Sequence, residues 1–304
     1  AQGQQFASTT VSMSDWYAGA EYIDNASIEG IDDLDRGFSS ANKKGYDFKT
    51  FLTYKYGFTK DITVGFKYGY TYQKDEASIA SSEGAGFAGD WVTEGGSDFT
   101  LLGTYRLDET SSLDMFIDFP VCSASSLESV CSTQLASSEN TTRIGTSGGQ
   151  GSGYYRVGGA ISSNWITVMD THWMGSLFTS MALSDEVSGE KVSAPFTYGA
   201  TFGAIRPIKQ NHSWTGSISL SRMLEYSSYN SQAQGKVNYG NHSALAVKVE
   251  YLWDFMAKVQ LRPYANFAMM QEPTITFTSG GQRRSIEYTS GSKVTFGAEL
   301  SATF

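Results

Sequence analysis

Hydrophobic and polar residues alternate with a period of two along most of the chain. Between Ile62 and Tyr72 every even position is apolar or aromatic, and every odd position is Thr, Gly or Lys. Between Val294 and Phe304 the even positions are again apolar, and the odd positions are Thr, Gly, Glu or Ser. Because successive side chains of a strand point to opposite faces, this pattern predicts strands with one apolar and one polar face.

The same period predicts twelve strands, each close to the ~9–11 residues that a tilted strand needs to cross hydrocarbon. They are expected at residues 15–23, 46–58, 62–74, 97–107, 112–120, 153–163, 170–182, 195–206, 212–224, 241–253, 256–270 and 284–304.

The predicted connections alternate between short and long. The short turns are residues 59–61, 108–111, a turn near Asn164, 208–211 and 253–255, and the long loops are 24–45, 75–96, 121–152, 183–194, 225–240 and 271–283. This alternation is typical of outer-membrane barrels, which have short periplasmic turns and longer external loops. An even number of strands then places both termini on the periplasmic side.

The fold class predicted is all-β: one antiparallel up-and-down transmembrane barrel of about 12 strands. Counts of 10 or 14 stay open, because residues 6–13 and a hairpin around 274–289 change the number. Residues 1–14 are expected to form a periplasmic N-terminal segment, or a plug in the lumen, before a barrel domain at 15–304. The alternative is a soluble β-sandwich or lipocalin-like barrel. Strands with a Tyr- and Phe-rich apolar face and a Gly-, Ser- and Thr-rich polar face favour the membrane barrel.

Composition agrees with this interpretation. No run approaches 18 uninterrupted apolar residues, which excludes a transmembrane helix. The mean hydropathy of −0.28 is ordinary, as expected where lipid-facing and lumen-facing residues alternate. The net charge of −9 argues against nucleic acid as a partner. Residues 1–5 look like a mature end left by signal-peptide cleavage, although an artificial start would look the same.

The sequence resembles Gram-negative outer-membrane β-barrel proteins over nearly its whole length. The terminal Phe304, preceded by apolar residues at alternate positions, is similar to the C-terminal signal read by the barrel-assembly machinery. Residues 56–65 (YGFTKDITVG) resemble the strand–turn–strand repeat of transporter-like barrels, including proteins linked to uptake of hydrophobic or aromatic compounds. The resemblance implies an outer-membrane location, and it identifies no substrate site.

Charged residues inside the strands are the candidate lumen-lining positions, because the apolar face is expected to meet lipid. The candidates are Lys49, Lys55, Lys67, Arg106, Asp114, Asp118, Arg156, Lys248, Glu250, Lys258, Arg262 and Glu299. They predict a narrow charged channel for passive transport of small solutes. The alternative is a salt-bridged interior that only stabilises the barrel.

The remaining candidate chemistry lies in the loops and the histidines. Cys122 and Cys131 are expected to form one structural disulfide within the 121–152 loop. The acids at 32, 33 and 35 are interpreted as solvated charge, with a divalent cation as the alternative. Long loops leave open a structural or adhesive surface barrel. A lipid-modifying enzyme would use the chain's three His, at 172, 212 and 242, but no Ser–His spacing supports it.

Expected partners follow from the location. They are outer-membrane lipid and lipopolysaccharide, the barrel-assembly machinery and an unidentified small solute. A monomer is favoured, and neither a cofactor nor a metal is expected.

Overall fold

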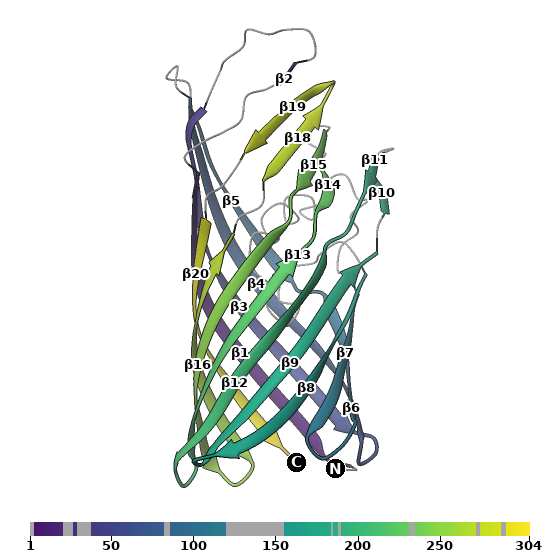
Figure 1. Cartoon of the computed structure of the whole chain (residues 1–304), viewed down its shortest axis with the longest axis vertical. Helices are drawn as coiled ribbons and strands as arrows, with labels where there is room; N and C mark the ends of the chain where they lie inside the picture. The colour runs from purple at the N-terminus through teal and green to yellow at the C-terminus, as the bar shows by residue number, and fades with distance from the viewer. Residues whose placement is uncertain are drawn as a thin grey trace.

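Twelve antiparallel strands close into a barrel in the computed structural model (Figure 1). The structure describes residues 3–20, 27–28, 38–81, 86–119, 155–183, 185–187, 190–230, 235–271, 274–286 and 290–304. Within these ranges, no helix is long and apolar enough to cross a membrane.

The strands of the wall follow the chain in up-and-down order. They are β1 (Gln5–Ala20), β3 (Phe38–Gly57), β4 (Ile62–Ser81), β6 (Phe99–Arg106), β7 (Ser111–Phe119), β8 (Arg156–Val168), β9 (Thr171–Ala182), β12 (Phe196–Lys209), β13 (His212–Met223), β16 (His242–Met256), β17 (Val259–Met270) and β20 (Ser290–Thr303). Each wall strand pairs with two neighbours, and β1 pairs with both β20 and β3, which closes the barrel.

The other strands extend beyond the wall at the end opposite the termini (Figure 1). They are β2 (Ser27–Ile28), β5 (Gly86–Gly96), β10 (Asp185–Val187), β11 (Glu190–Val192), β14 (Tyr226–Asn230), β15 (Gly235–Tyr239), β18 (Ile275–Ser279) and β19 (Gln282–Ile286). Strand β5 pairs with the distal half of β4. Strands β14, β15, β18, β19 and β2 form a separate five-stranded sheet.

The twelve-strand count is confirmed, but several boundaries differ from the expectation. Strand β1 starts at Gln5 rather than at residue 15, so residues 5–14 lie in the wall. The expected loop 75–96 is largely strand, because β4 runs to Ser81 and β5 covers Gly86–Gly96. The expected last strand, 284–304, is divided: its first residues belong to β19, and β20 starts at Ser290. The first residues of β1 pair with residues 47–56 of β3 and so lie within the apolar belt, although small polar residues there weaken the alternation. The distal part of β4 and the sheet that contains β19 continue past the belt, where alternation no longer marks the strands.

The turn expected near Asn164 lies five residues further along. Met169 and Asp170 connect β8 to β9, and both have positive φ, at 51° and 60°. Two consecutive positive φ values define the type I′ geometry that suits the twist of a two-residue hairpin. A register shift between Asn164 and Ile166 marks a bulge in β8, and this interruption produces the turn-like signal near Asn164.

The turn between β6 and β7 is held by one carboxylate. Asp108 Oδ1 accepts hydrogen bonds from the backbone N–H groups of Thr110 (2.7 Å) and Ser111 (2.8 Å). These donors, with the Thr110 backbone contributing most, hold the pKa of the Asp108 carboxyl below its ordinary value. The arrangement is an Asx-type turn at the end of the barrel where both termini lie.

The outer surface of the wall carries a broad apolar belt. On β3 and β4 the outward residues run in pairs from Tyr56 and Val64 to Tyr46 and Lys74. Ten residues of strand at about 3.3 Å each, tilted by about 45°, cover roughly 23 Å, close to the ~25 Å apolar band of outer-membrane barrels. Beyond Tyr46, the exposed Lys44 pairs with Glu76 at 3.1 Å, so charge begins where the belt ends.

Candidate functional site

Eleven of the twelve predicted lining residues lie on the inward face. Direct cross-strand partners share a face, and one such row connects Thr53, Lys67, Thr100, Asp118 and Arg156. Equivalent rows place the other eight: Lys49, Lys55, Arg106, Asp114, Lys248, Glu250, Arg262 and Glu299.

Lys258 is the exception and corrects the expectation. It lies in the turn between β16 and β17, with an exposed side chain. Its backbone carbonyl accepts a hydrogen bond from Thr303 N–H at 2.9 Å. The predicted strand started at residue 256, but β17 starts at Val259, so the alternation was extended through a turn.

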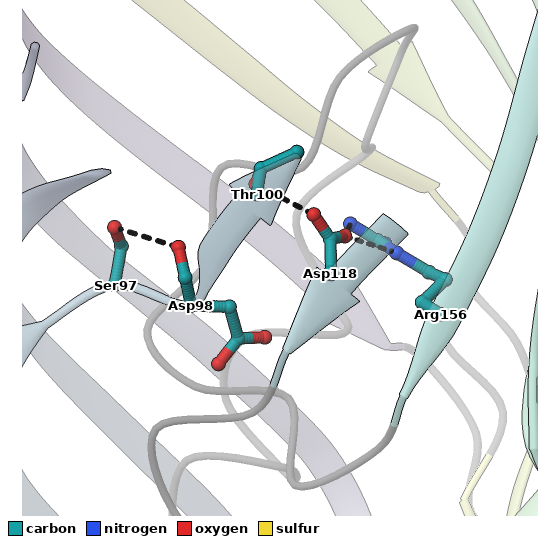
Figure 2. A network of polar contacts seen from close by, with 5 residues as sticks. All are labelled: Ser97, Asp98, Thr100, Asp118 and Arg156. Atoms are coloured by element: carbon teal, nitrogen blue, oxygen red, sulfur yellow. Dashed lines mark hydrogen bonds and ion pairs between the residues drawn. The ribbon is translucent and has the colours of Figure 1, made fainter. Parts of the chain in front are cut away.

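The tightest polar cluster of the described interior is centred on Asp118. Its Oδ2 accepts hydrogen bonds from Arg156 Nε (2.9 Å) and Nη2 (2.7 Å), and its Oδ1 accepts one from Thr100 Oγ1 (2.6 Å). Figure 2 shows Asp118 between these two partners on adjacent strands, with Asp98 nearby, just before the strand that carries Thr100. Asp118 is fully buried and Arg156 is 7% exposed. A buried carboxylate with three charge-assisted or hydroxyl donors is a rigid, satisfied ion pair.

A second cluster joins β3 and β20, the two neighbours of β1. Asp47 Oδ2 contacts Lys293 Nζ at 2.9 Å and Lys49 Nζ at 3.5 Å, and the Asp47 side chain is fully buried. Asp47 was expected to face the lumen as one of the acids within the strands, whereas Lys293 was not among the predicted lining residues. A signal for Lys293 was present, since it shares the odd positions of its strand with Glu299 and faces the same way.

Several inward aromatic rings lie flat against the wall on a glycine of the adjacent strand. A Cβ at Gly69 would lie 2.5 Å from Phe51 Cδ1, and a Cβ at Gly158 would lie 2.5 Å from the Phe116 ring. Only glycine leaves space for a ring in this position. Trp16 on Gly45, Phe178 on Gly199 and Tyr264 on Gly297 repeat the arrangement.

Three of the predicted cations sit over these rings. Lys67 Nζ is 4.2 Å from the Phe51 centroid, Lys248 Nζ is 4.5 Å from that of Tyr264, and Arg156 Cζ is 5.6 Å from that of Phe116. Each lies within the ~6 Å range of cation–π attraction. Glycine, ring and cation therefore form successive layers from the wall inward. The ring holds the cation in place, and because the ring lies against the wall it narrows the lumen little.

The remaining inward charges are held by short-range partners. Lys248 pairs with Glu250 at 2.6 Å, and Asp114 accepts a hydrogen bond from Thr104 Oγ1 at 2.6 Å. Arg262 Nη2 donates to Gln260 Oε1 at 2.9 Å, and Arg262 is in register with Glu299. These inward charges therefore have partners within a strand or on the next one, as expected for charges inside a narrow barrel.

One sector of the inner wall is uncharged. The inward positions of β9, β12 and β13 between residues 174 and 223 carry no Asp, Glu, Lys or Arg. Nine of them bear hydroxyls: Ser176, Ser180, Thr197, Thr201, Ser213, Thr215, Ser217, Ser219 and Ser221. We refer to this set as the hydroxyl wall. In the strand order of the barrel, β9, β12 and β13 lie six strands from β1, β3 and β4, and so on the opposite side.

The three histidines are separate from one another. His172 contacts Thr167 Oγ1 through Nδ1 at 2.8 Å, and His242 Nδ1 lies 3.2 Å from the Gly240 carbonyl oxygen. His212 hydrogen-bonds Tyr251 through Nδ1 and stacks on Trp253. Each of these contacts ties a strand end to its neighbourhood. None of them joins a histidine to a serine, as a Ser–His catalytic pair would require.

Other predicted features lie elsewhere. Cys122, Cys131 and the acids at 32, 33 and 35 fall outside the described residues. Phe304 directly follows β20 at the seam of the barrel, where its N–H donates to the Gln5 carbonyl (2.8 Å) and its carbonyl accepts from Gln5 N–H (3.3 Å). The Phe304 side chain is 65% exposed, so the backbone alone closes the seam there.

A closed antiparallel barrel with an apolar outer belt and a polar interior defines a transmembrane β-barrel. The chain is accordingly a multi-pass protein of the bacterial outer membrane. No protein-family model matches the sequence, and no curated protein matches it either.

Solved structures similar to this chain are outer-membrane barrels of several kinds. The COG4313 outer membrane channel from Pseudomonas putida F1 is 12% identical, with a TM-score of 0.45, covering 100% of this chain and 96% of that one. A Pseudomonas aeruginosa FadL homologue is 8% identical, with a TM-score of 0.48, covering 98% and 90%. The outer membrane protease OmpT from Escherichia coli is 8% identical, with a TM-score of 0.37, covering 99% and 97%.

Proposed function

We propose that the barrel is a narrow channel for passive diffusion of small polar solutes. The observation that carries this proposal is the inward placement of both signs of charge along the barrel, opposite an apolar outer belt. A barrel that only anchored surface loops would not need so many ionised side chains on its inner face, since each is costly unless paired or hydrated. Water in a lumen supplies that hydration.

The dimensions favour small solutes. Twelve strands lie between the filled eight-stranded barrels and the 16-stranded porins with wide aqueous channels. Rings that lie flat on glycines, such as Phe51 on Gly69 and Tyr264 on Gly297, keep large side chains close to the wall. Fixed cations above them give the lumen an electrostatic surface that a passing ion must follow.

Single-channel recording tests the proposal. Refolded protein in a planar bilayer should give discrete conductance steps, with the fold checked by heat-dependent gel mobility. Charge reversal by Lys67→Glu or Arg262→Glu should shift the reversal potential in a salt gradient toward cations. Lys60→Glu is the matched control, because the Lys60 side chain is 86% exposed in a turn. Absence of steps, or unchanged selectivity in both lumen variants, contradicts the channel.

A second candidate function uses the surface beyond the membrane. The five-stranded sheet of β14, β15, β18, β19 and β2 stands outside the barrel and is more structure than a pore needs. A structural or adhesive role predicts that deleting the long loops removes binding of a surface partner and leaves conductance intact. That the chain is not an enzyme stays a prediction.

We also propose lipopolysaccharide as the lipid neighbour of the outer rim. Lys44 and Lys74 share Glu76, at 3.1 Å and 3.2 Å, on the outward face at the distal edge of the apolar belt. Lysines at this height suit phosphate groups of a lipid headgroup. We further propose that the barrel-assembly machinery recognises Phe304 and that the protein is a monomer.

A further inference from the structure

Six side chains form an ordered array on the outer face of β12, β13 and β16. Two register rows define the array: Arg206, Trp214 and Tyr251 in one, and Lys209, His212 and Trp253 in the other. The three strands are neighbours in the wall, and the array lies at the end of the barrel that carries both termini (Figure 1). Direct cross-strand partners share a face, and the exposed Trp214 (48%) and Trp253 (41%) identify it as the outward one. We refer to these six residues as the periplasmic array.

The aromatic rings of the array hold the imidazole of His212 in place. The imidazole stacks on Trp253, with ring centroids 6.1 Å apart and planes 10° from parallel, and its Nδ1 hydrogen-bonds the Tyr251 hydroxyl. Trp214 packs on Tyr251 with ring centroids 5.0 Å apart. When the tyrosine hydroxyl donates to Nδ1, the proton of the neutral imidazole is on Nε2. Nε2 has no hydrogen-bond partner among the described residues, so the array holds a fixed donor that still lacks an acceptor.

Two cations on β12 flank this donor. Lys209 lies directly opposite His212, and Arg206 is a diagonal neighbour of His212 on the same face, within reach of long side chains. Both cations are exposed, and neither forms an ion pair within the described part of the chain. Asp254 faces inward and accepts a hydrogen bond from a glutamine side chain at 2.7 Å, and Asp170 is the one acid in the neighbouring turn between β8 and β9. The array therefore offers two cations and one neutral donor to an anionic oxygen group.

The array lies where the apolar belt ends, and the surface above it is open. Beyond Arg206, the next four outward positions of β12, at 204, 202, 200 and 198, carry no charge. The register row next to the array joins Trp173, Ala204, Gly216 and Val249. A Cβ at Gly216 would meet nothing within 4 Å. An uncovered glycine weakens a strand and often marks the place where a ligand approaches the backbone closely.

These two features, side by side, match the two parts of a phospholipid. We propose that the periplasmic array binds the phosphodiester of a phospholipid in the periplasmic leaflet, with an acyl chain lying over Ala204 and Gly216. The phosphate oxygens accept hydrogen bonds from the Arg206 guanidinium, the Lys209 ammonium and His212 Nε2–H. The indoles of the array lie at the headgroup level, where amphipathic rings are favoured. The inference depends on the outer-membrane location and not on whether the lumen conducts.

Native mass spectrometry of the folded, detergent-solubilised protein tests the site with three probes. Dioleoylphosphatidylglycerol carries phosphate and acyl chains, dioleoylglycerol lacks the phosphate, and glycerol phosphate lacks the chains. We expect the phospholipid to bind at the lowest concentration of the three. Arg206→Gln/Lys209→Gln should weaken phospholipid binding about tenfold, the size expected for losing hydrogen bonds from charged groups. Lys60→Gln, which removes an exposed cation from a turn at the same end, is the control and should leave binding unchanged.

A second pair of variants tests the place of the acyl chain. Gly216→Val fills the open surface without changing a charge, and valine suits a strand, so the variant should fold and bind the phospholipid severalfold more weakly. Gly103→Val is the matched control, because Gly103 is in register with the outward Val64 and its surroundings are equally open. Heat-dependent gel mobility verifies the fold of each variant.

The outcomes separate the parts of the proposal. Equal binding of dioleoylglycerol and the phospholipid, or unchanged phospholipid binding in Arg206→Gln/Lys209→Gln, overturns the site. Binding of glycerol phosphate at the same concentration as the phospholipid overturns a lipid as the occupant, and unchanged binding in Gly216→Val overturns the place of the acyl chain. None of these results requires ion flow, so failure of the site and failure of the proposed channel are observed independently.

Discussion

The ion pair between Asp118 and Arg156 offers the sharpest test of how the interior is stabilised. Asp118→Asn preserves the shape of the side chain and the Thr100 contact, but it removes the charge that two Arg156 nitrogens share at 2.9 Å and 2.7 Å. Because the Asp118 carboxylate is fully buried, water does not replace it. The guanidinium is then left uncompensated in the interior.

The expected cost follows from that geometry. Breaking a buried pair by removing one partner costs about 3–5 kcal/mol, whereas removing both charges costs much less. We therefore expect Asp118→Asn to lower the free energy of unfolding by about 3 kcal/mol, and Asp118→Asn/Arg156→Met to recover about 2 kcal/mol of that loss. The exposed pair of Lys44 and Glu76 is the control, and neutralising either residue should cost under about 1 kcal/mol.

Urea unfolding of the protein refolded into short-chain phospholipid vesicles measures these differences through tryptophan fluorescence. A double-mutant cycle then gives the coupling energy between the two residues. If the single changes add to the double change within about 0.5 kcal/mol, the two side chains act independently and the reasoning fails. A loss in Asp118→Asn as small as that in the exposed pair would show that the cluster is well hydrated.

Three further predictions concern the wall, a turn and the seam. Gly69→Ala should cost about 1–3 kcal/mol in urea unfolding because a Cβ collides with the Phe51 ring and the wall, while Gly103→Ala, which meets nothing within 4 Å, should be neutral. Asp108→Ala should lower the free energy of unfolding at neutral pH, and the difference from wild type should vanish below about pH 4. The Asp108 carboxyl has a lower pKa in the folded than in the unfolded protein, so its contribution to stability is lost as the pH falls and the group is protonated. A difference that does not depend on pH contradicts this. Phe304→Ala should refold normally in vitro but assemble poorly in cells, since backbone bonds hold the seam; equal losses in both assays would assign Phe304 a structural role.

The strand count and the facing of side chains were predictable because a single rule decides both. Lipid excludes unpaired backbone polar groups and charge, so alternation is strict wherever the wall crosses hydrocarbon. Positions such as Lys67 and Glu299 were assigned to the inward face for this reason, and the structure places them there. The rule stops at the rim. Residues 86–96 were predicted as a loop because this stretch is rich in glycine and does not alternate, although it pairs with residues 70–80 of β4.

Pairing inside the lumen was not predictable, because it depends on register between strands far apart in sequence. Asp47 and Lys293 are 246 positions apart, and only closure of the barrel through β1 brings them to 2.9 Å. The prediction for Lys258 was wrong for a local reason. The alternation continues past the end of the strand, and no turn residue marks residues 257 and 258 as a turn.

The glycines show where sequence and function meet in this barrel. A strand interior weakened by glycine is unfavourable unless something covers it, and here a ring from the next strand does so. The ring in turn carries a cation, as Lys67 does on Phe51. Trp16 on Gly45 differs from this series, because its neighbour Lys293 contacts Asp47. The same device therefore serves stability and function together: the glycine makes room for the ring, and the ring holds the cation close to the wall, so the charge stays inside the lumen without filling it.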